Sequence, residues 1–409
     1  MSFVPVTACR SCDGPELLPV LDLGEQPLAN AFRRPADTSP EARYPLALVF
    51  CPACSLVQLT GNVPPAELFD DYPYFSSYSD SMVEAMRLLA DRLTTAEGLD
   101  GDSLVVEVAS NDGYLLKHYL ERGVAVLGVE PAANVAQVAV AAGVPTLAAY
   151  FGVAAARAVL ASHGPAHVLH ANNVMAHVPD VNDLVAGFAL LLADDGVAVV
   201  ESPYLGRFVS DVEFDTTYHE HVFYYSLTAL DVLLRRHGLV VSDLEHLDVH
   251  GGSLRCFVRH EGAPVGQAVT ALLAEEDRLG VRTPAYYRDF AERVDRLRAR
   301  TLALLHGLKA SGATLHGYGA AAKGTVLLNH FGIGPDLLDK VVDRSPHKQG
   351  LEMPGVGLAI EDPAALLRDR PSHVLLLAWN LLDEVLEQQA AYREQGGLFV
   401  VPIPEPRVV

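Results

Sequence analysis

The stretch LVVEVASNDG, residues 104–113, carries the strongest fold signal in the chain. Residues 104–108 are apolar apart from Glu107, as in a buried strand, and Gly113 ends a tight turn before a helical pattern. The strand pattern returns at VAVLGVE, HVLHANN and VAVVESP, which begin at residues 124, 167 and 197, with helical patterns in between. Such alternation predicts an α/β fold built on a doubly wound parallel sheet.

Two more strand-like runs follow, residues 239–250 and 253–260, with Gly251 and Gly252 between them as in a hairpin. A parallel sheet that ends in an antiparallel pair resembles the layout of a class I methyltransferase. Residues 263 to about 310 are helical and charged. A second alternation of strands and helices then predicts a smaller, Rossmann-like sheet at the C-terminal end.

The N-terminal 70 or so residues are rich in proline and turn residues, so they cannot bury much core alone. Their two CxxC pairs, Cys9 with Cys12 and Cys51 with Cys54, can place four thiolates around a tetrahedral Zn²⁺. We expect one structural zinc ion, because four thiolates leave no open coordination position for catalysis. The alternatives are two incidental pairs or a redox CxxC.

The charge balance disfavours several classes of partner. Lys plus Arg number 30 against 51 Asp plus Glu, which gives a formal net charge of -21. Such a chain lacks a broad electrostatic grip on nucleic acid or anionic membrane. The start of the chain has no secretory signal pattern, and Gly143 and Pro145 interrupt the longest uncharged stretch, residues 131–156. We expect a cytoplasmic protein with no membrane or nucleic-acid partner.

The turn after the first strand has the features of a nucleoside site. Glu130 ends the second strand, and an acid there suits ribose hydroxyls. Ala109 and Asn111 occupy positions where a dinucleotide site usually has glycine, which favours S-adenosylmethionine (SAM), a nucleoside without phosphate, over a pyrophosphate. A purely structural turn is the alternative. The expected SAM contacts are Glu107, Ala109, Asn111, Gly113, Glu130, Asn172 and Asn173.

A cluster of titratable residues, TYHEHVFYY at residues 217–225, follows the fifth strand at the same edge of the sheet. In an extended loop, His219 and His221 would point to one side and Glu220 to the other. This arrangement favours acid–base chemistry, because a histidine near neutral pKa can accept a proton from an acidic carbon. A metal site would lack an evident third ligand, and packing is the remaining alternative. His177, taken alone, is more typical of a helix start or a core.

The run GYGAAAKGT, residues 317–325, lies between a strand and a helix, where a phosphate can bind. Lys323 supplies a cation there. The run is not GxxxxGK[ST], so ATP hydrolysis is unsupported. Asp343, at the end of the next strand, either binds a ribose or caps a turn.

Six motifs in this order cover almost the whole chain and carry a family resemblance. They are the paired CxxC, SNDG, ANNVMAHV, YHEHVFYYS, HGGSLR and GYGAAAKG. Together they resemble the bacterial nucleotide-sugar C-methyltransferases. The resemblance implies a SAM-dependent, zinc-containing enzyme of three domains that makes a branched-chain deoxysugar for a natural product. The best known members methylate C-3' of dTDP-4-keto-deoxysugars.

The resemblance also implies roles for particular residues. His221 corresponds to the catalytic base, with Tyr218, Glu220 and His177 as neighbours and Tyr72 as a further active-site tyrosine. The reaction would remove the C-3 proton, which the C-4 ketone acidifies, to give an enolate that accepts the methyl group. The expected contacts to the sugar nucleotide are Lys323, Tyr318 and Tyr224.

The expected domains are a zinc-binding domain over residues 1–75, a SAM-binding domain over 76–262, and a Rossmann-like domain over 263–409 that contributes to sugar-nucleotide binding. We expect a monomer, because the three domains can bury each other's surfaces. Methylation at C-5 is an alternative. Two rivals from other classes are an NAD-dependent nucleotide-sugar oxidoreductase that uses the C-terminal turn, and a zinc-containing binding protein.

Overall fold

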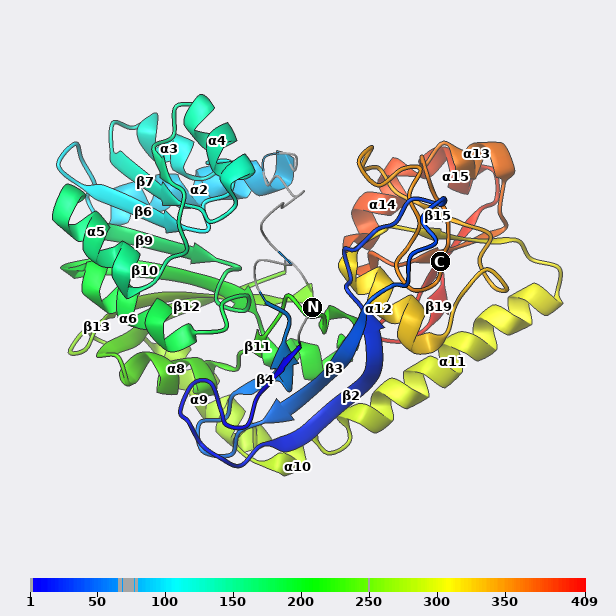
Figure 1. Ribbon diagram of the computed structural model, residues 1–409, viewed down its shortest axis with the longest axis horizontal. Coiled ribbons are helices and arrows are strands. Elements are labelled where there is room, and N and C mark those ends of the chain that lie inside the picture. The colour runs from blue at the N-terminus through cyan, green and yellow to red at the C-terminus, as the bar shows by residue number, and fades with distance from the viewer. Residues whose placement is uncertain (1–2, 65–67, 69–76, 78–79, 249–250) are drawn as a thin grey trace.

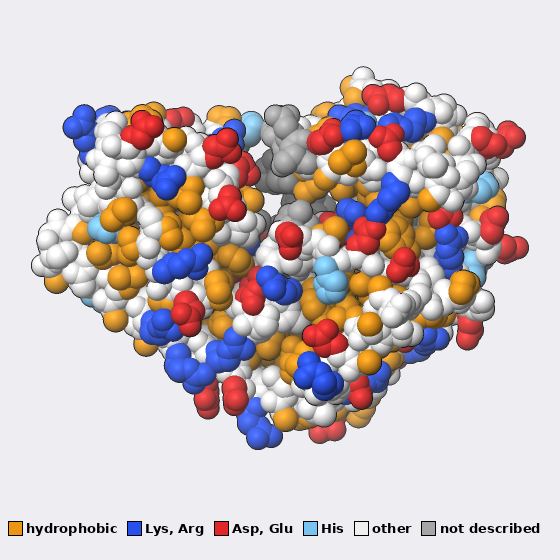
Figure 2. Space-filling view, turned by 180° about the vertical axis from the view of Figure 1, so that it is seen from behind, with side chains coloured by type: hydrophobic (Ala, Val, Ile, Leu, Met, Phe, Trp, Pro, Cys, Tyr) orange, Lys and Arg blue, Asp and Glu red, His pale blue; other side chains and the backbone are white. Residues whose placement is uncertain are grey.

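The computed structural model of the chain describes residues 3–64, 68, 77, 80–248 and 251–409. Two α/β lobes lie side by side, and the long N-terminal strands β2 and β3 run beneath and between them (Figure 1). Acidic and basic side chains are interspersed over the face shown in Figure 2. Within the described part of the chain, no helix is both long and apolar enough to cross a membrane.

The first lobe is built on a seven-stranded sheet of order β12-β13-β10-β9-β6-β7-β8. Its strands pair in parallel, except that β13 is antiparallel to both β10 and β12. This arrangement confirms the predicted parallel sheet with an antiparallel pair at one edge. The strands are β6 (Leu104–Val108), β7 (Ala125–Val129), β8 (Thr146–Leu147), β9 (Ala166–Asn172), β10 (Leu192–Pro203), β12 (Leu239–Leu247) and β13 (Ser253–His260).

Helices cover both faces of this sheet, which is why β6 is apolar apart from Glu107. Val105 of β6 packs into a cluster with α2 and α3, whereas Val106 packs into the cluster on the opposite face. All five residues of β6 are buried. The helices of this lobe are α2 (Asp80–Ala96), α3 (Leu116–Leu120), α4 (Ala133–Ala141), α5 (Val153–His163), α6 (Val181–Leu191), α8 (Leu227–Arg235) and α9 (Gln267–Leu279).

The second lobe is a six-stranded sheet of order β16-β15-β14-β17-β18-β19, parallel apart from β19. This is the predicted Rossmann-like sheet. In this sheet β15 lies on one side of β14 and β17 lies on the other, so the direction of the connections reverses at β14. Ligands of such sheets bind at the carboxyl end of the strand where the direction reverses. The strands are β14 (Leu315–Tyr318), β15 (Val341–Val342), β16 (Ile360–Glu361), β17 (His373–Leu376), β18 (Leu398–Val401) and β19 (Arg407–Val408).

Helical segments surround and connect the second sheet. The longest, α11 (Phe290–Ala310), follows α10 (Pro284–Tyr287) and leads from the first lobe to the second (Figure 1). The others are α12 (Ala322–Phe331), α13 (Ala365–Asp369), η4 (Trp379–Leu381), α14 (Leu382–Gln388) and α15 (Ala390–Glu394).

The N-terminal strands form a four-stranded sheet of order β11-β4-β3-β2. Three strands come from the N-terminal segment: β2 (Leu18–Pro27), β3 (Arg43–Phe50) and β4 (Val57–Leu59). The fourth, β11 (Phe223–Tyr224), comes from the segment that carries the predicted base, and it pairs antiparallel with β4. A separate two-stranded ladder joins β1 (Val4–Pro5) to β5 (Gly61–Asn62).

A continuous apolar core links this sheet to the second lobe. Leu46 and Leu48 of β3 belong to the same cluster as Phe208 and Phe214, which lie on α7 (Leu205–Ser210) and η2 (Phe214–Thr216). Phe214 stacks on Phe331 of α12 with 5.0 Å between ring centroids. The segment between β10 and β11 therefore lies between the lobes and contacts both.

Close packing at Gly113, in the turn after β6, can be tested by substitution. Gly113 has φ of 81° and a Cβ there would lie 2.8 Å from Val144, whereas Gly123 has φ of 78° with no heavy atom within 4 Å of such a Cβ. We expect Gly113→Ala to lower the free energy of unfolding by about 2 to 4 kcal/mol, from backbone strain plus overpacking. Gly123→Ala should cost only the backbone strain, about 1 to 2 kcal/mol. Urea denaturation would measure both, and equal losses would contradict the steric explanation.

Candidate functional site

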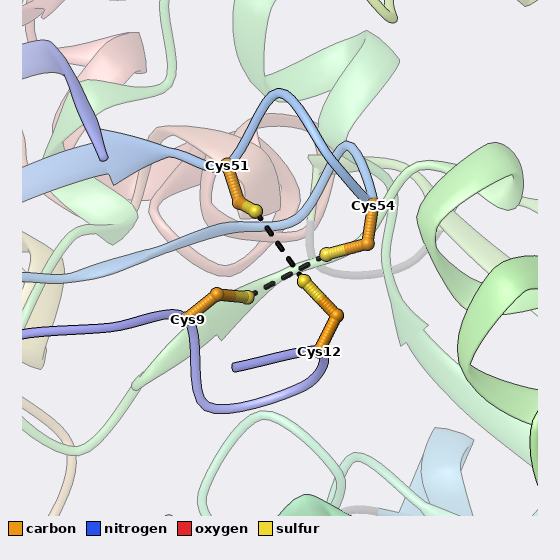
Figure 3. A group of neighbouring side chains, drawn as sticks. All are labelled: Cys9, Cys12, Cys51 and Cys54. Atoms are coloured by element: carbon orange, nitrogen blue, oxygen red, sulfur yellow. Dashed lines mark hydrogen bonds between the residues drawn. The ribbon is translucent and has the colours of Figure 1, made fainter. Parts of the chain in front are cut away.

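The four cysteines of the two CxxC pairs come together, although 38 residues separate the pairs. All four Sγ atoms lie within 4.8 Å of one another, with 3.5 Å between Cys9 and Cys54 and 3.6 Å between Cys12 and Cys51 (Figure 3). Tetrahedral zinc with bonds of about 2.3 Å requires sulfur atoms about 3.8 Å apart. The group fits a structural Zn²⁺.

The two pairs share one backbone conformation. The N–H of Asp13 donates to the Cys9 carbonyl and the N–H of Ser55 donates to the Cys51 carbonyl, each at 2.8 Å. Asp13 and Ser55 both have positive φ, 58° and 65°. Each CxxC therefore closes a tight turn that directs its two sulfur atoms to the same side.

The expected SAM turn lies at the carboxyl end of β6. Ala109 and Asn111 have φ of 53° and 50°, so both adopt the left-handed conformation that glycine adopts most readily. Glu130, at the end of β7, holds this turn: its carboxylate accepts the N–H groups of Asn111 and Ala132, both at 2.9 Å. Gly113 follows within the same turn.

Several polar atoms around this turn lack a partner. Burial, followed by the nearby carboxyls of Glu130 and Asp112, raises the pKa of Glu107 well above its usual value. Among the described residues, nothing hydrogen-bonds Oε2 of Glu107 or the side-chain oxygens of Asn172 and Asn173. Buried polar atoms of this kind need partners, and the amino and hydroxyl groups of SAM would provide them. These residues therefore fit the expected cofactor.

His221 makes a polar contact through each nitrogen of its imidazole ring. Its Nδ1 is 3.2 Å from the carbonyl oxygen of Thr216, and its Nε2 is 2.8 Å from the hydroxyl of Tyr218. A carbonyl only accepts, so Nδ1 carries the proton and Nε2 presents its lone pair to Tyr218. His177 contacts the same ring edge-on, with 4.8 Å between centroids, and burial lowers its pKa to about 4. The structure thus brings His221, Tyr218 and His177 together.

The expectation that His219 and His221 point to one side is wrong. The chain turns at this point, with the N–H of His221 donating to the carbonyl of Tyr218 at 2.9 Å. The His219 ring instead packs edge-on against Tyr44 of β3. Burial lowers the pKa of His219 to about 4.

Glu220 reaches a partner far away in sequence. Nδ2 of Asn30, which follows β2, donates to Oε1 of Glu220 at 2.7 Å. Burial raises the pKa of Glu220 to about 7, and the Asn30 hydrogen bond opposes that rise. The N-terminal segment therefore contributes to the surroundings of the predicted base, which sequence patterns did not indicate.

A narrow cavity adjoins this group. The hydroxyl of Tyr224 donates to the carbonyl of Thr216 at 3.3 Å, so Tyr224 and His221 share an acceptor. The side chains that line the cavity include Ser202, Tyr204, Phe208, Glu213, His221 and Tyr224. Glu213 was not among the residues predicted from sequence.

The C-terminal turn lies between β14 and α12, as the sequence predicts. Nζ of Lys323 is 2.9 Å from Oδ1 of Asn380 and 4.6 Å from the centre of the Trp379 ring, both on η4 of the second lobe. Tyr318 is buried in the second lobe, where its hydroxyl contacts Gln388 and Gln389. The structure does not bring Tyr318 to His221.

Two further groups lie around this turn: Asp343, for which the sequence left a ribose contact or a turn cap open, and Lys348, which was not predicted from sequence. Asp343 accepts the N–H groups of Ala320 and Ser345 at 2.6 and 2.7 Å, so it closes the turn. Lys348 donates to the carbonyl of Ala320 at 2.7 Å and supplies a second cation near the turn. Tyr72 lies outside the described residues.

The four-cysteine site leads to a testable expectation about metal. Purified protein should hold one Zn²⁺ per chain, and Cys12→Ser should lower the zinc content and solubility before it changes the chemistry, because a structural metal supplies folding free energy. Cys256, a buried cysteine of β13 outside the cluster, provides the control: Cys256→Ala should keep its zinc. Metal analysis that finds less than half an equivalent in active enzyme would count against a structural zinc.

Comparison with known proteins identifies the family of the chain. Three family models match the chain in order: a zinc binding domain over residues 9–69, a methyltransferase domain over residues 82–244, and a C-methyltransferase C-terminal domain over residues 248–404. The C-methyltransferase NovU of Streptomyces niveus is 38% identical over 408 residues, which cover 99% of this chain and 97% of NovU.

Solved methyltransferase structures also align with part of the chain. A SAM-dependent methyltransferase from Clostridium acetobutylicum aligns at 12% identity and a TM-score of 0.36 over 44% of this chain and 92% of that one. Magnesium protoporphyrin IX methyltransferase from Synechocystis with bound SAM aligns at 12% identity and a TM-score of 0.33, over 43% of this chain and 79% of that one. The three domain matches, together with 38% identity to NovU over almost the whole chain, show the family. The chain belongs to the SAM-dependent C-methyltransferases that carry a structural zinc domain.

Proposed function

We propose that this enzyme methylates a ring carbon, C-3', of a dTDP-4-keto-deoxysugar in the biosynthesis of a branched-chain deoxysugar. The observation that carries the proposal is the hydrogen bond between His221 and Tyr218, with the His177 ring packed edge-on against His221, beside an edge that fits SAM. Because the family transfers methyl groups to carbon, the base must act on a carbon acid, and a ketone next to the carbon supplies that acidity. The oxidoreductase alternative has no support from the family assignment.

His221 acts as the base. Its Nδ1–H donates to the Thr216 carbonyl, and its Nε2 lone pair accepts the C-3 proton once the Tyr218 hydroxyl, which donates to Nε2 here, turns to the substrate oxygen. The electron pair of the C–H bond moves into the C-3–C-4 bond, and the ketone oxygen becomes an enolate oxygen. Tyr218, with Glu220 and His177, orients the base or stabilises that oxygen. Bound SAM supplies the electrophilic methyl group, to which C-3 becomes attached while the ketone re-forms.

The substrate's two ends occupy different lobes. We assign the diphosphate to the turn before α12, where backbone N–H groups begin a helix and Lys323 or Lys348 supplies positive charge. Tyr224 lies beside His221 and contacts the sugar. Tyr318 supports the nucleotide side through Gln388 and Gln389, which line a surface pocket together with Arg344.

We further propose that the three domains span residues 1–75, 76–262 and 263–409 and that the enzyme works as a monomer in the cytoplasm. Free cysteines suit a reducing compartment. Light scattering on the purified enzyme would test the oligomeric state.

The reaction itself can be tested directly. Incubation with SAM and a dTDP-4-keto-6-deoxysugar should give a product heavier by one methylene, with the new methyl on C-3 by NMR. A methyl found on C-5 would support the alternative position. A sugar that stays unmethylated while SAM binds would contradict the proposed substrate.

The SAM assignment predicts the behaviour of Glu130. Glu130→Ala should weaken SAM binding roughly tenfold to a hundredfold, since a charge-assisted contact contributes about 1.5 to 3 kcal/mol. Asp343→Ala is a matched control, because Asp343 also accepts two backbone N–H groups but lies in the second lobe. Calorimetry should show SAM affinity near wild type in that control. Unchanged affinity in Glu130→Ala would place the cofactor elsewhere.

The role of His221 predicts a loss of rate without a loss of fold. His221→Asn should lower activity by about 10² to 10⁴, the contribution of a general base, while SAM affinity and melting temperature stay close to wild type. With S-adenosylhomocysteine in deuterated solvent, wild type should exchange the C-3 hydrogen and the variant far more slowly. Equal exchange rates would assign the base to Tyr218 or His177.

A further inference from the structure

Glu213 is a buried carboxyl in the cavity that His221 lines. It follows α7, is 3% exposed, and shares the cavity with His221 and Tyr224. Its Oε1 has no hydrogen-bond partner among the described residues. A buried oxygen without a partner is uncommon in a folded protein, because its desolvation is not compensated. A substrate group in the cavity would supply the missing partner.

The glycine pair of the HGGSLR motif leaves room for this carboxyl. Gly251 and Gly252 have φ of 94° and 122°, which other residues rarely adopt. A Cβ on Gly251 would lie 2.5 Å from Oε1 of Glu213, and one on Gly252 would lie 2.8 Å from Cγ of Arg207. The backbone of this turn thus packs directly against the Glu213 carboxyl and helps to fix its position.

Burial favours the neutral form of this carboxyl. Burial, followed by the charge of Asp215, raises the pKa of Glu213 to about 8, and Lys323 of α12 opposes the rise. Asp215 has a pKa of about 6, raised by burial, and accepts the indole N–H of Trp379 at 2.8 Å. Burial and the neighbouring Asp215 carboxyl thus both favour the protonated form of Glu213. Other charged or titratable groups near Glu213 are Asp211, Arg207 and, among the residues that line the cavity, His221, Tyr204, Tyr224 and Tyr225.

We propose that Glu213 is a further catalytic residue, a carboxylic acid that donates a hydrogen bond to the substrate oxygen on which negative charge develops. This inference rests on the proposed function. His221 removes the C-3 proton, the electron pair of that bond forms the enolate, and the O–H of Glu213 stabilises the enolate oxygen without transferring its proton. When C-3 takes the methyl group the ketone re-forms, and the proton on His221 leaves to solvent. A neutral acid placed this way stabilises the transition state more than the ketone.

Two substitutions separate this role from packing. Glu213→Leu removes the donor at similar volume and should lower kcat by about 10² to 10³, as loss of one oxyanion donor does. Glu213→Gln keeps an N–H donor and should stay within about tenfold of wild type, since a neutral hydrogen bond contributes about 1 kcal/mol. SAM affinity and melting temperature, measured alongside, should stay close to wild type in the Gln variant.

The pH profile gives a readout that packing would not change. Because the protonated form of Glu213 is the active one, wild-type activity should fall as the pH rises through about 8. This alkaline limb of the pH–activity profile should vanish in Glu213→Gln. Asp215→Asn keeps the acceptor for Trp379 but removes a negative neighbour, so the limb should move to lower pH.

Three results would overturn the inference while leaving the proposed function intact: a Leu variant within threefold of wild type, a Gln variant as slow as the Leu variant, or an alkaline limb that persists in the Gln variant. Wild-type methylation of the sugar nucleotide is measured first in the same series. If wild type forms no methylated sugar, the proposed function fails, and the inference fails with it.

Discussion

The placement of the catalytic segment depends on one short strand pairing. Phe223 and Tyr224 of β11 pair with Gln58 and Val57 of β4, and the N–H of Val222 donates to Ala176 on the other side at 2.7 Å. The chain directly before this pairing carries His221, so the proposed base cannot shift without breaking one of these bonds. Because β4 begins three residues after Cys54, the zinc site fixes the strand that in turn positions His221. Backbone hydrogen bonds thereby link the four-cysteine site to the proposed base.

The two large sheets have the same carboxylate-to-backbone hydrogen bonds at corresponding positions. An acid at the end of the second strand of each sheet, Glu130 or Asp343, accepts one N–H from the turn after the first strand and another two residues beyond itself. In the first lobe this lets Ala109 and Asn111 hold a left-handed conformation without glycine. Closing the turn by a carboxylate rather than by small residues leaves backbone N–H groups and polar side chains facing the ligand edge.

Local patterns were sufficient to predict the large sheets, whereas contacts between distant segments were not. The strands β6, β7, β9 and β10 are long apolar runs, and their pattern depends only on burial by their own helices. The two-residue strand β11 has no such pattern, because its pairing is set by a strand 165 residues earlier. The alternation of His219 and His221 was misleading for the same reason: a turn held by β3 and β4 replaces the extended loop. Asn30 and Glu213 carry no local motif at all, and only the folded chain places them beside the base.

The contact of Trp379 with Asp215 has a consequence for measurement. Trp379 is the single tryptophan of the chain, and its indole N–H is bonded to the segment that leads to His221 while Lys323 lies over its ring. Indole emission responds to the charges and hydrogen bonds around the ring, so the fluorescence of the unlabelled enzyme reports on the junction between the two lobes. Ligands that enter either lobe can be followed in real time by this intrinsic optical signal, with no dye and no engineered residue.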